Sequence, residues 1–231
     1  MPQSPDPRGA ISRIQWILPA TAFAAGAVDI IGFANLGGVF ASAMTGNFAL
    51  LAYHFAQGNT LSAIGSVIAL LGFVTGCIIG FTLRRGRSAH TTVGLLLGAE
   101  CGLLLFFALY SLWSTQTTLI PVMRLQIVIL AVAMGLQAVV GQMVSVSTIV
   151  FTTTLTRLVG GITDAVAGRS STGLAEVRGQ IAVIASYLLG ALLAGTLAVH
   201  EMGGVVFLPL GAVAVAFTAH CLFSGRQIDA A

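Results

Sequence analysis

Apolar residues fill long blocks of this chain, and short polar stretches separate the blocks. A helix needs about 20 mostly apolar residues to cross a bilayer. The blocks that meet this requirement are 14–34, 62–83, 92–113, 119–141, 179–199 and 203–223. The pattern predicts an all-α membrane protein with about six transmembrane helices.

Two further stretches, 36–57 and 142–168, are apolar but interrupted, with small and hydroxyl residues near the middle of each. Irregular backbone cannot face lipid, because its amide and carbonyl groups find no water there. We therefore expect both segments to be buried in protein or to line a wet cavity.

The arginines indicate the orientation of the chain, because cytoplasmic loops of membrane proteins carry an excess of positive charge. If 36–57 does not cross and the N-terminus is cytoplasmic, every arginine except Arg124 faces the cytoplasm. If 36–57 crossed alone, the cluster of Arg84, Arg85 and Arg87 would lie on the outer side. The favoured arrangement has six spans, both termini in the cytoplasm, and two segments that enter without crossing.

Composition agrees with a membrane protein. Charged residues make up 7% of the chain, against about 25% in soluble domains. The net charge is +3, but the arginines lie between apolar blocks and form no patch. The lipid bilayer is therefore an expected partner and nucleic acid is not. Residues 1–13 are expected to be a disordered cytoplasmic tail, since the apolar stretch after Arg13 is longer than that of a signal peptide, the alternative interpretation.

An internal repeat divides the chain into two units. The segment 26–32 has a partner in 135–141, each with two glycines six residues apart, and 44–48 matches 151–155 after a two-residue shift. The units would be 14–113 and 114–225, with 226–231 as a second cytoplasmic tail. Three spans in each unit would invert the second unit relative to the first, as in many secondary transporters. The alternative is a chance match among Gly, Ala and Thr.

Glycines also recur at four-residue spacing within two adjacent blocks, a pattern that lets helix backbones approach closely. They are Gly72, Gly76 and Gly80, and Gly94, Gly98 and Gly102. The spacing leaves open whether these glycines pack within one chain or between copies in a homo-oligomer.

Two acids lie inside apolar blocks, where a carboxylate is costly and usually marks a site or a paired charge. Asp29 shares a helical stripe with Gly26 and Gly32; its alternative interpretation is a residue near the outer headgroups. Glu100 lies near the predicted centre of the third block. It is either a functional residue or a structural partner of Arg124 or of a buried hydroxyl.

The polar breaks supply the remaining candidates for a substrate or ion site. Thr45, Gly46 and Asn47 interrupt the first segment, and freed backbone groups at such a break can bind a ligand. A plain surface turn is the alternative. The equivalent candidates in the second unit are Thr152, Thr153 and the nearby Gln137. We expect no catalytic residue, metal site or cofactor, because the chain has no motif of the usual enzyme classes and no metal-ligand spacing.

The segments 26–33 and 38–47, above all Val39-Phe40 and Met44-Thr45-Gly46-Asn47, resemble the YoaK-like family of bacterial inner-membrane proteins. The resemblance extends from about Ile14 to Phe223. In the second half that family shows a Gly-x-Gln-Asn-Ala-like stretch and a Thr-Gly turn. This chain has an alanine after Gln137, and Thr152-Thr153, so a second-half site does not carry over directly.

The resemblance implies the membrane fold but no substrate, because the family is one of unknown function. The repeat and the breaks favour a small secondary transporter or permease that carries a small molecule or an ion. The alternatives are a membrane protein that binds a lipid or protein partner without transport, and an intramembrane enzyme.

The orientation predicts which loops a membrane-impermeant thiol reagent reaches. In a variant without native cysteines, Gly86→Cys and Gly168→Cys are expected to react only from the cytoplasm, and Asn59→Cys only from outside, because arginine-rich loops stay inside. Labelling of intact cells and of inverted vesicles measures this. Reaction of Gly86→Cys from outside would show that 36–57 crosses.

Overall fold

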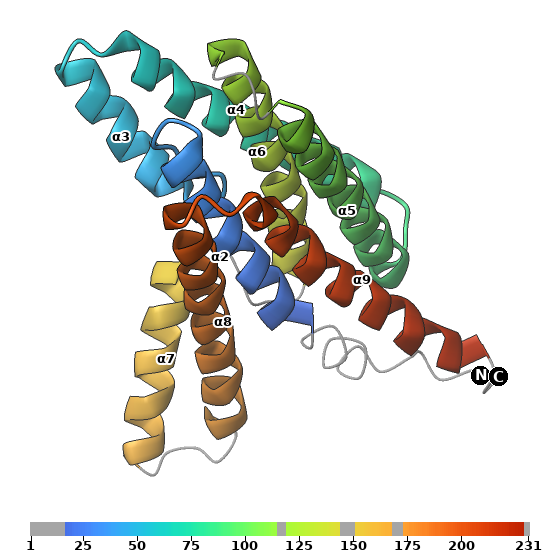
Figure 1. Ribbon diagram of the computed structural model, residues 1–231. Helices are drawn as coiled ribbons and strands as arrows, with labels where there is room; N and C mark the ends of the chain where they lie inside the picture. Colours follow the sequence, from blue (N-terminus) through green and yellow to red (C-terminus); the bar gives the residue numbers. More distant parts are fainter. Residues whose placement is uncertain (1–16, 115–118, 144–150, 168–172, 229–231) are drawn as a thin grey trace.

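The computed structural model describes residues 17–114, 119–143, 151–167 and 173–228. In these ranges the chain forms helices joined by short connections, with no strand (Figure 1). The helices are α2 (Leu18–Asn35), α3 (Met44–Ala56), α4 (Thr60–Arg84), α5 (Ala89–Trp113), α6 (Ile120–Met143), α7 (Phe151–Val166), α8 (Gly173–Val199), the 3₁₀ helix η2 (Gly203–Val206) and α9 (Phe207–Ile228).

Six segments of the described chain are long and apolar enough to cross a membrane. They are Leu18–Asn35, Thr60–Arg84, Ala89–Trp113, Ile120–Met143, Glu176–Val199 and Gly203–Leu222. Each coincides with one apolar block of the sequence. The prediction of an all-α protein with six spanning helices is confirmed.

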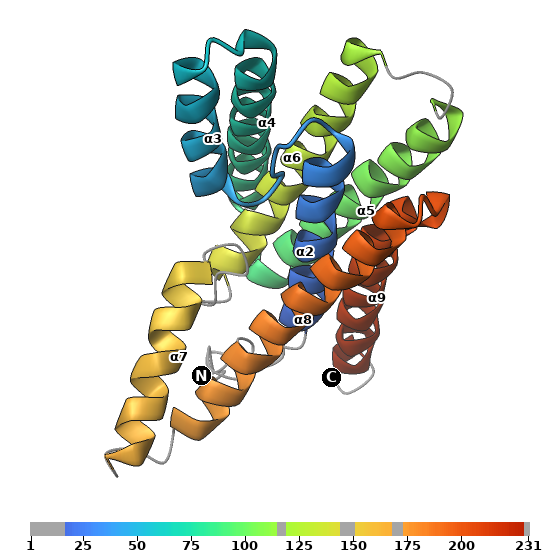
Figure 2. The ribbon, with the colours of Figure 1, turned by 60° about the vertical axis from the view of Figure 1, so that its left-hand side comes forward.

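The segment 36–57 does not run from one end of the bundle to the other. Helix α3 has 13 residues, so it is about 20 Å long and too short to span a bilayer. Helix α2 ends and α4 begins at the same end of the bundle (Figure 2). This arrangement agrees with a segment that enters without crossing. In the second unit the break expected at Thr152 and Thr153 is not observed, because both residues lie in the first turn of α7, a helix of 16 residues. Residues 144–150, which precede α7, lie outside the described ranges.

The most extensive helix packing joins α2 to α8 and α4 to α6. At the second crossing Gly76 and Gly135 face each other. A Cβ on Gly76 would collide with the carbonyl oxygen of Val132, and one on Gly135 with the carbonyl oxygen of Phe73. Close backbone approach through small residues is the usual means of tight packing in membranes, where lipid supplies no hydrophobic drive.

The crossing of α2 and α8 has the same geometry. A Cβ on Gly26 would meet the carbonyl oxygen of Tyr187, and one on Gly190 that of Phe23. At both crossings the oxygen belongs to the residue three positions before the opposing glycine. Gly26 and Gly135 are also the glycines that the sequence pairs as repeat positions. The same crossing geometry therefore occurs twice, and each crossing joins the first half of the chain to the second.

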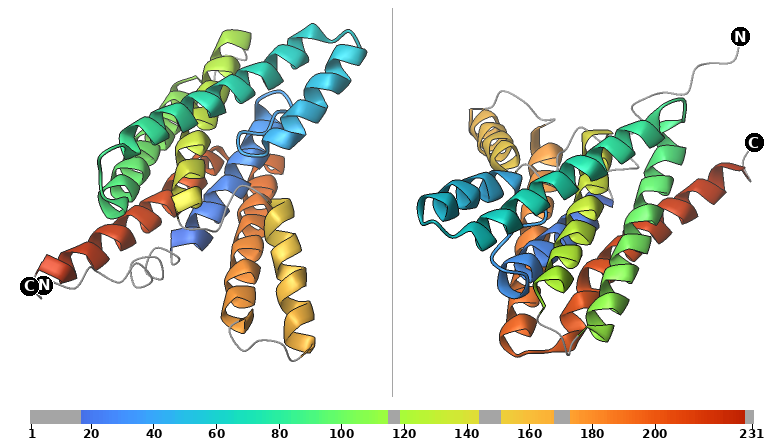
Figure 3. Two further views of the ribbon diagram at one scale, coloured as in Figure 1. Left: turned by 180° about the vertical axis from the view of Figure 1, so that it is seen from behind. Right: turned by 90° about the horizontal axis from the view of Figure 1, so that it is seen from above.

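The two glycine stripes pack within the chain. Gly72 and Gly80 extend the contact of α4 with α6. On α5, a Cβ at Gly94 would lie 3.2 Å from His220 and one at Gly98 3.5 Å from Phe217, both residues of α9. Helices α5 and α9 lie side by side when seen from above (Figure 3). The hairpins α3–α4 and α7–α8 extend from opposite ends of the bundle (Figures 1 and 2).

Adding a methyl group at either crossing is expected to destabilise the fold. Gly135→Ala and Gly26→Ala each place a Cβ against a backbone carbonyl, and overpacking of this kind typically costs about 1–3 kcal/mol. Thermal unfolding in detergent measures the loss. Gly102→Ala is the matched control, because its Cβ would meet nothing within 4 Å. Equal stability of Gly135→Ala and Gly102→Ala would contradict the described crossing.

Candidate functional site

After α2 the chain turns and runs back beside this helix. Gly37 and Gly38 make the turn with φ angles of 86° and 77°, a region that glycine adopts readily. The rings of Phe33 and Phe40 then stack with centroids 5.3 Å apart. A Cβ on Gly32 would lie 2.6 Å from the Val39 carbonyl oxygen. The chain after the turn thus runs back along α2, with Val39 beside Gly32 and Phe40 beside Phe33. As a result, α3 begins inside the bundle.

Asp29 binds the returning chain where α3 begins. Its carboxylate accepts hydrogen bonds from the Ser42 amide at 2.7 Å, the Ser42 hydroxyl at 2.6 Å and, more weakly, the Ala43 amide at 3.4 Å. The Tyr187 hydroxyl of α8 donates a further bond at 2.8 Å. Asp29 is 1% exposed, so it does not lie among the outer headgroups.

The chemistry of a helix start explains this bond pattern. The first amide groups of a helix have no partner within the helix, and the N-cap residue of α3, Ala43, makes no side-chain cap. Asp29, from α2, accepts from the two amides just before the first helical residue, those of Ser42 and of the N-cap residue Ala43. A negative charge is also favourable at this end of a helix, where the peptide dipoles leave partial positive charge.

Asn47, one turn further along α3, supplies hydrogen-bond partners to the returning backbone. Its side-chain oxygen accepts from the Phe40 amide at 2.9 Å, and its amide donates to the Phe40 carbonyl at 2.5 Å. A Cβ on Gly46 would lie 2.9 Å from the Phe40 ring. Asn47 is fully buried, so this break is not a plain surface turn. Thr45 is exposed.

The remaining candidates from the sequence, Gln137, Thr152 and Thr153, lie on α6 and α7. Gln137 of α6 donates to the Thr21 carbonyl of α2 at 3.0 Å, and its own side-chain oxygen has no partner among the described residues. Thr152 and Thr153 are exposed in the first turn of α7.

Glu100 is fully buried on α5, and neither carboxylate oxygen has a hydrogen-bond partner in the described parts of the chain. The expected structural pairing with Arg124 or a hydroxyl is therefore not observed. The two buried acids differ completely in their surroundings, since Asp29 has several donors and Glu100 has none.

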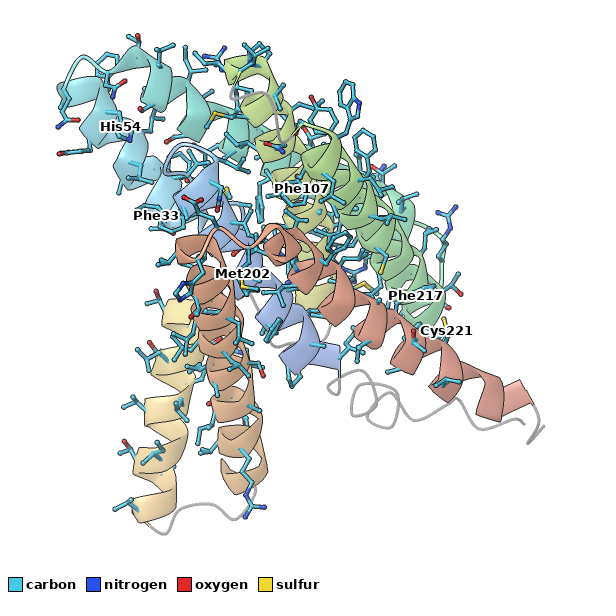
Figure 4. All side chains as sticks on the ribbon, in the orientation of Figure 1. Phe33, His54, Phe107, Met202, Phe217 and Cys221 are labelled. Atoms are coloured by element: carbon cyan, nitrogen blue, oxygen red, sulfur yellow. The ribbon has the colours of Figure 1, made fainter. Side chains whose placement is uncertain are left out.

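A pocket of about 270 Å³ lies at the end of the bundle where α2, α5 and α8 end. Met202, in the connection from α8 to α9, is one of its lining residues (Figure 4). Its polar lining residues are Asn35, Ser111 and Glu201. Asn35 is six residues beyond Asp29, which corresponds to about 9 Å along the helix.

Comparison with known proteins identifies the family of this chain. The family described as "Protein of unknown function (DUF1275)" matches residues 17–219, which include every spanning helix almost completely. The chain belongs to the DUF1275 family. It is 31% identical over 157 residues to the UPF0700 transmembrane protein YoaK of Bacillus subtilis (strain 168), covering 66% of this chain and 67% of that protein. The predicted resemblance to a YoaK-like family is confirmed.

No solved structure matches the chain significantly. The six apolar helices and the transmembrane relative establish this DUF1275 protein as a multi-pass membrane protein. The family description assigns no activity, so function has to be argued from the geometry.

Sequence reasoning missed three members of the site. Ser42 and Phe40 were part of the family-like motif but not chosen as candidates, and Tyr187 was not noticed. Tyr187 did carry a signal, because it lies in the middle of the block 179–199, and a buried tyrosine hydroxyl usually has a partner. Nothing in the sequence indicated that this partner is Asp29.

Removing the donor from α8 is expected to weaken the packing of the two halves. Tyr187→Phe should lower the free energy of unfolding by about 1 kcal/mol, the typical net value of one such bond. Asp29→Ala should cost more, because the amide and the hydroxyl of Ser42 then lose their acceptor inside the bundle. Thermal unfolding measures both. Tyr53→Phe is the control, since the Tyr53 hydroxyl binds only Gln57 on the exposed surface. No difference between the two tyrosine variants would contradict the described bond.

Proposed function

We propose that this protein is a small secondary transporter or permease of the bacterial inner membrane, with both termini in the cytoplasm. The observation that carries the proposal is the 2.8 Å hydrogen bond from Tyr187 to Asp29. It joins the second half of the chain to the first at the point where the helical backbone is broken. Secondary transporters bind substrate at such breaks, near the midplane and between two repeats.

The two glycine crossings support an inverted repeat. The first span of each unit packs on the second span of the other unit, through glycines that meet the same carbonyl position. A relation of this kind fits two three-span units of opposite orientation. In transporters of this architecture, one unit moves against the other around the central site.

The pocket at the end of α2, α5 and α8 supports an entry path for a small molecule or ion. It combines apolar walls with the polar side chains of Asn35, Ser111 and Glu201, a mixture typical of small-molecule sites. It also lies at a junction of the two halves, because α2 and α5 come from the first unit and α8 from the second.

A second candidate function is binding of a lipid or protein partner without transport. The observation that favours it is the complete pairing of Asp29 with groups of its own chain. A carboxylate used in this way can simply hold the fold. A scaffold of this type would bind a partner but would not move a solute.

Ligand binding followed by uptake distinguishes the two functions. Purified protein is screened by thermal shift against amino acids, sugars, carboxylates and organic cations, in sodium and in potassium buffer, and each hit is tested for uptake into proteoliposomes. We expect at least one class to raise the unfolding temperature and to enter vesicles that contain the protein. Ala198→Trp, which fills the pocket, should abolish both signals.

Val199→Trp is the matched control. Val199 is next to Ala198 on α8, but it is 80% exposed and does not line the pocket. Its variant should bind and transport as the unmodified protein does. Ligands that bind without entering vesicles, or binding that Ala198→Trp leaves unchanged, would favour the scaffold over the transporter.

A further inference from the structure

Glu100 is a buried acid that no contact in the described structure explains. It is 0% exposed, and both of its carboxylate oxygens are without a hydrogen-bond partner among the described residues. It lies eleven residues after the start of α5 and thirteen before its end, about 16 and 20 Å from the two ends. Its buried neighbours along the same stripe are apolar: Val93, Leu96, Leu97, Leu104 and Phe107.

The helix α9 covers the opposite face of α5. Gly98, which contacts Phe217 of α9, is two residues before Glu100 and therefore about 200° away around the helix. Phe107 lies on the Glu100 stripe and belongs to the buried core. Phe217 belongs to α9 and is only partly buried (Figure 4). The carboxyl group of Glu100 thus belongs to the core side of α5.

No titratable group of the neighbouring elements is placed to neutralise Glu100. The elements packed against α5 are α4, α6, α9 and η2. Their titratable residues, with those of α5 itself, are Cys77 and Arg84 of α4, Arg124 of α6, His220, Cys221 and Arg226 of α9, and His90, Cys101 and Tyr110 of α5; η2 has none.

The positions of these groups exclude an ion pair. Gln126 binds Ser111 at 3.0 Å, so the start of α6, with Arg124, is level with a residue about 16 Å beyond Glu100. His220 contacts His90 and Gly94 near the start of α5. The helix position of Arg226 is six residues beyond His220, away from the level of Glu100. Arg84 ends α4, and the Cys77 thiol donates to the Gly135 carbonyl.

An ionised carboxylate in these surroundings would be strongly unfavourable, because a buried charge without a partner loses its hydration and gains nothing in return. A metal ion would need several ligands, and the described residues hold no group of three or more His, Cys, Asp or Glu that could bind one. A bound proton removes the unpaired charge without any further ligand. Acids of this kind within spanning segments are typical of proton pathways.

We propose that Glu100 is the proton-binding residue that couples transport to the proton gradient, an inference that rests on the proposed transport function. In the structure described, Glu100 is a neutral carboxylic acid. In a conformation that admits water, the carboxylic acid gives its proton to a water molecule and becomes a carboxylate. A hydronium ion on the other side of the membrane returns a proton, so that no electron is transferred and no other bond changes.

Infrared difference spectroscopy tests the proton directly and needs no known substrate. Protein in nanodiscs at neutral pH is compared with Glu100→Gln, and the probe is the carbonyl stretch of a protonated carboxylic acid. We expect this band in the unmodified protein, its loss in Glu100→Gln and its retention in Glu176→Gln, since Glu176 is exposed. Glu100→Met, of similar volume, replaces the glutamine variant if that variant does not fold.

Transfer to deuterated buffer tests exchange. The band should shift as deuterium replaces the proton, because a coupling residue must meet water in part of its cycle. A band that is absent, that persists in Glu100→Gln, or that never shifts would overturn the inference; the last result would indicate a permanently trapped acid. A shifting Glu100 band without uptake of any ligand would refute transport alone. Uptake by a protein that lacks the band would refute proton coupling at Glu100 alone.

Discussion

Hydrogen bonding of the broken backbone between α2 and α3 is the constraint on which the rest of the structure depends. Peptide groups inside an apolar bundle have no water to bind, so each unpaired group is costly. Asp29 pairs the start of α3, and Asn47 pairs both backbone groups of Phe40. These bonds hold the returning chain beside α2. Because α3 then leads back to the end where α2 stopped, α4 can cross the bundle against α6.

The two halves of the chain depend on each other for their packing. Each half buries its first span against the other half, α2 on α8 and α6 on α4. Neither half can therefore complete its packing alone. Tyr187 lies at one of these crossings, where its carbonyl meets Gly26 and its hydroxyl binds Asp29. The backbone break and the contact between the halves are thus parts of one structure.

The two buried acids illustrate how surroundings decide chemistry. Asp29 meets the amide groups of a helix start and a tyrosine hydroxyl, so its charge is hydrogen-bonded and its place in the fold is fixed. Glu100 meets apolar side chains, so a bound proton is its only means of avoiding an unpaired charge. The same class of residue, inside an apolar block, thus serves as a structural anchor in one helix and as the proposed proton site in the other.

Local patterns along the chain predict the six spans, the interruption at 36–57 and the candidate residues Asp29, Gly46 and Asn47. These are local properties, because length, apolarity and glycine spacing along one helix decide whether a segment spans a bilayer and where its backbone breaks. The family-like motif from Gly26 to Asn47 was visible for the same reason.

Which side chains meet becomes visible only in the folded chain. The Tyr187–Asp29 bond joins residues 158 positions apart. That Glu100 has no partner among the described residues depends on how α5, α6 and α9 are placed around it. Hydrophobic patterns fix which residues avoid water but not which helix lies opposite. The pairing of helices is set by close backbone contact at glycines such as Gly76 and Gly135, and such contact exists only once the chain has folded.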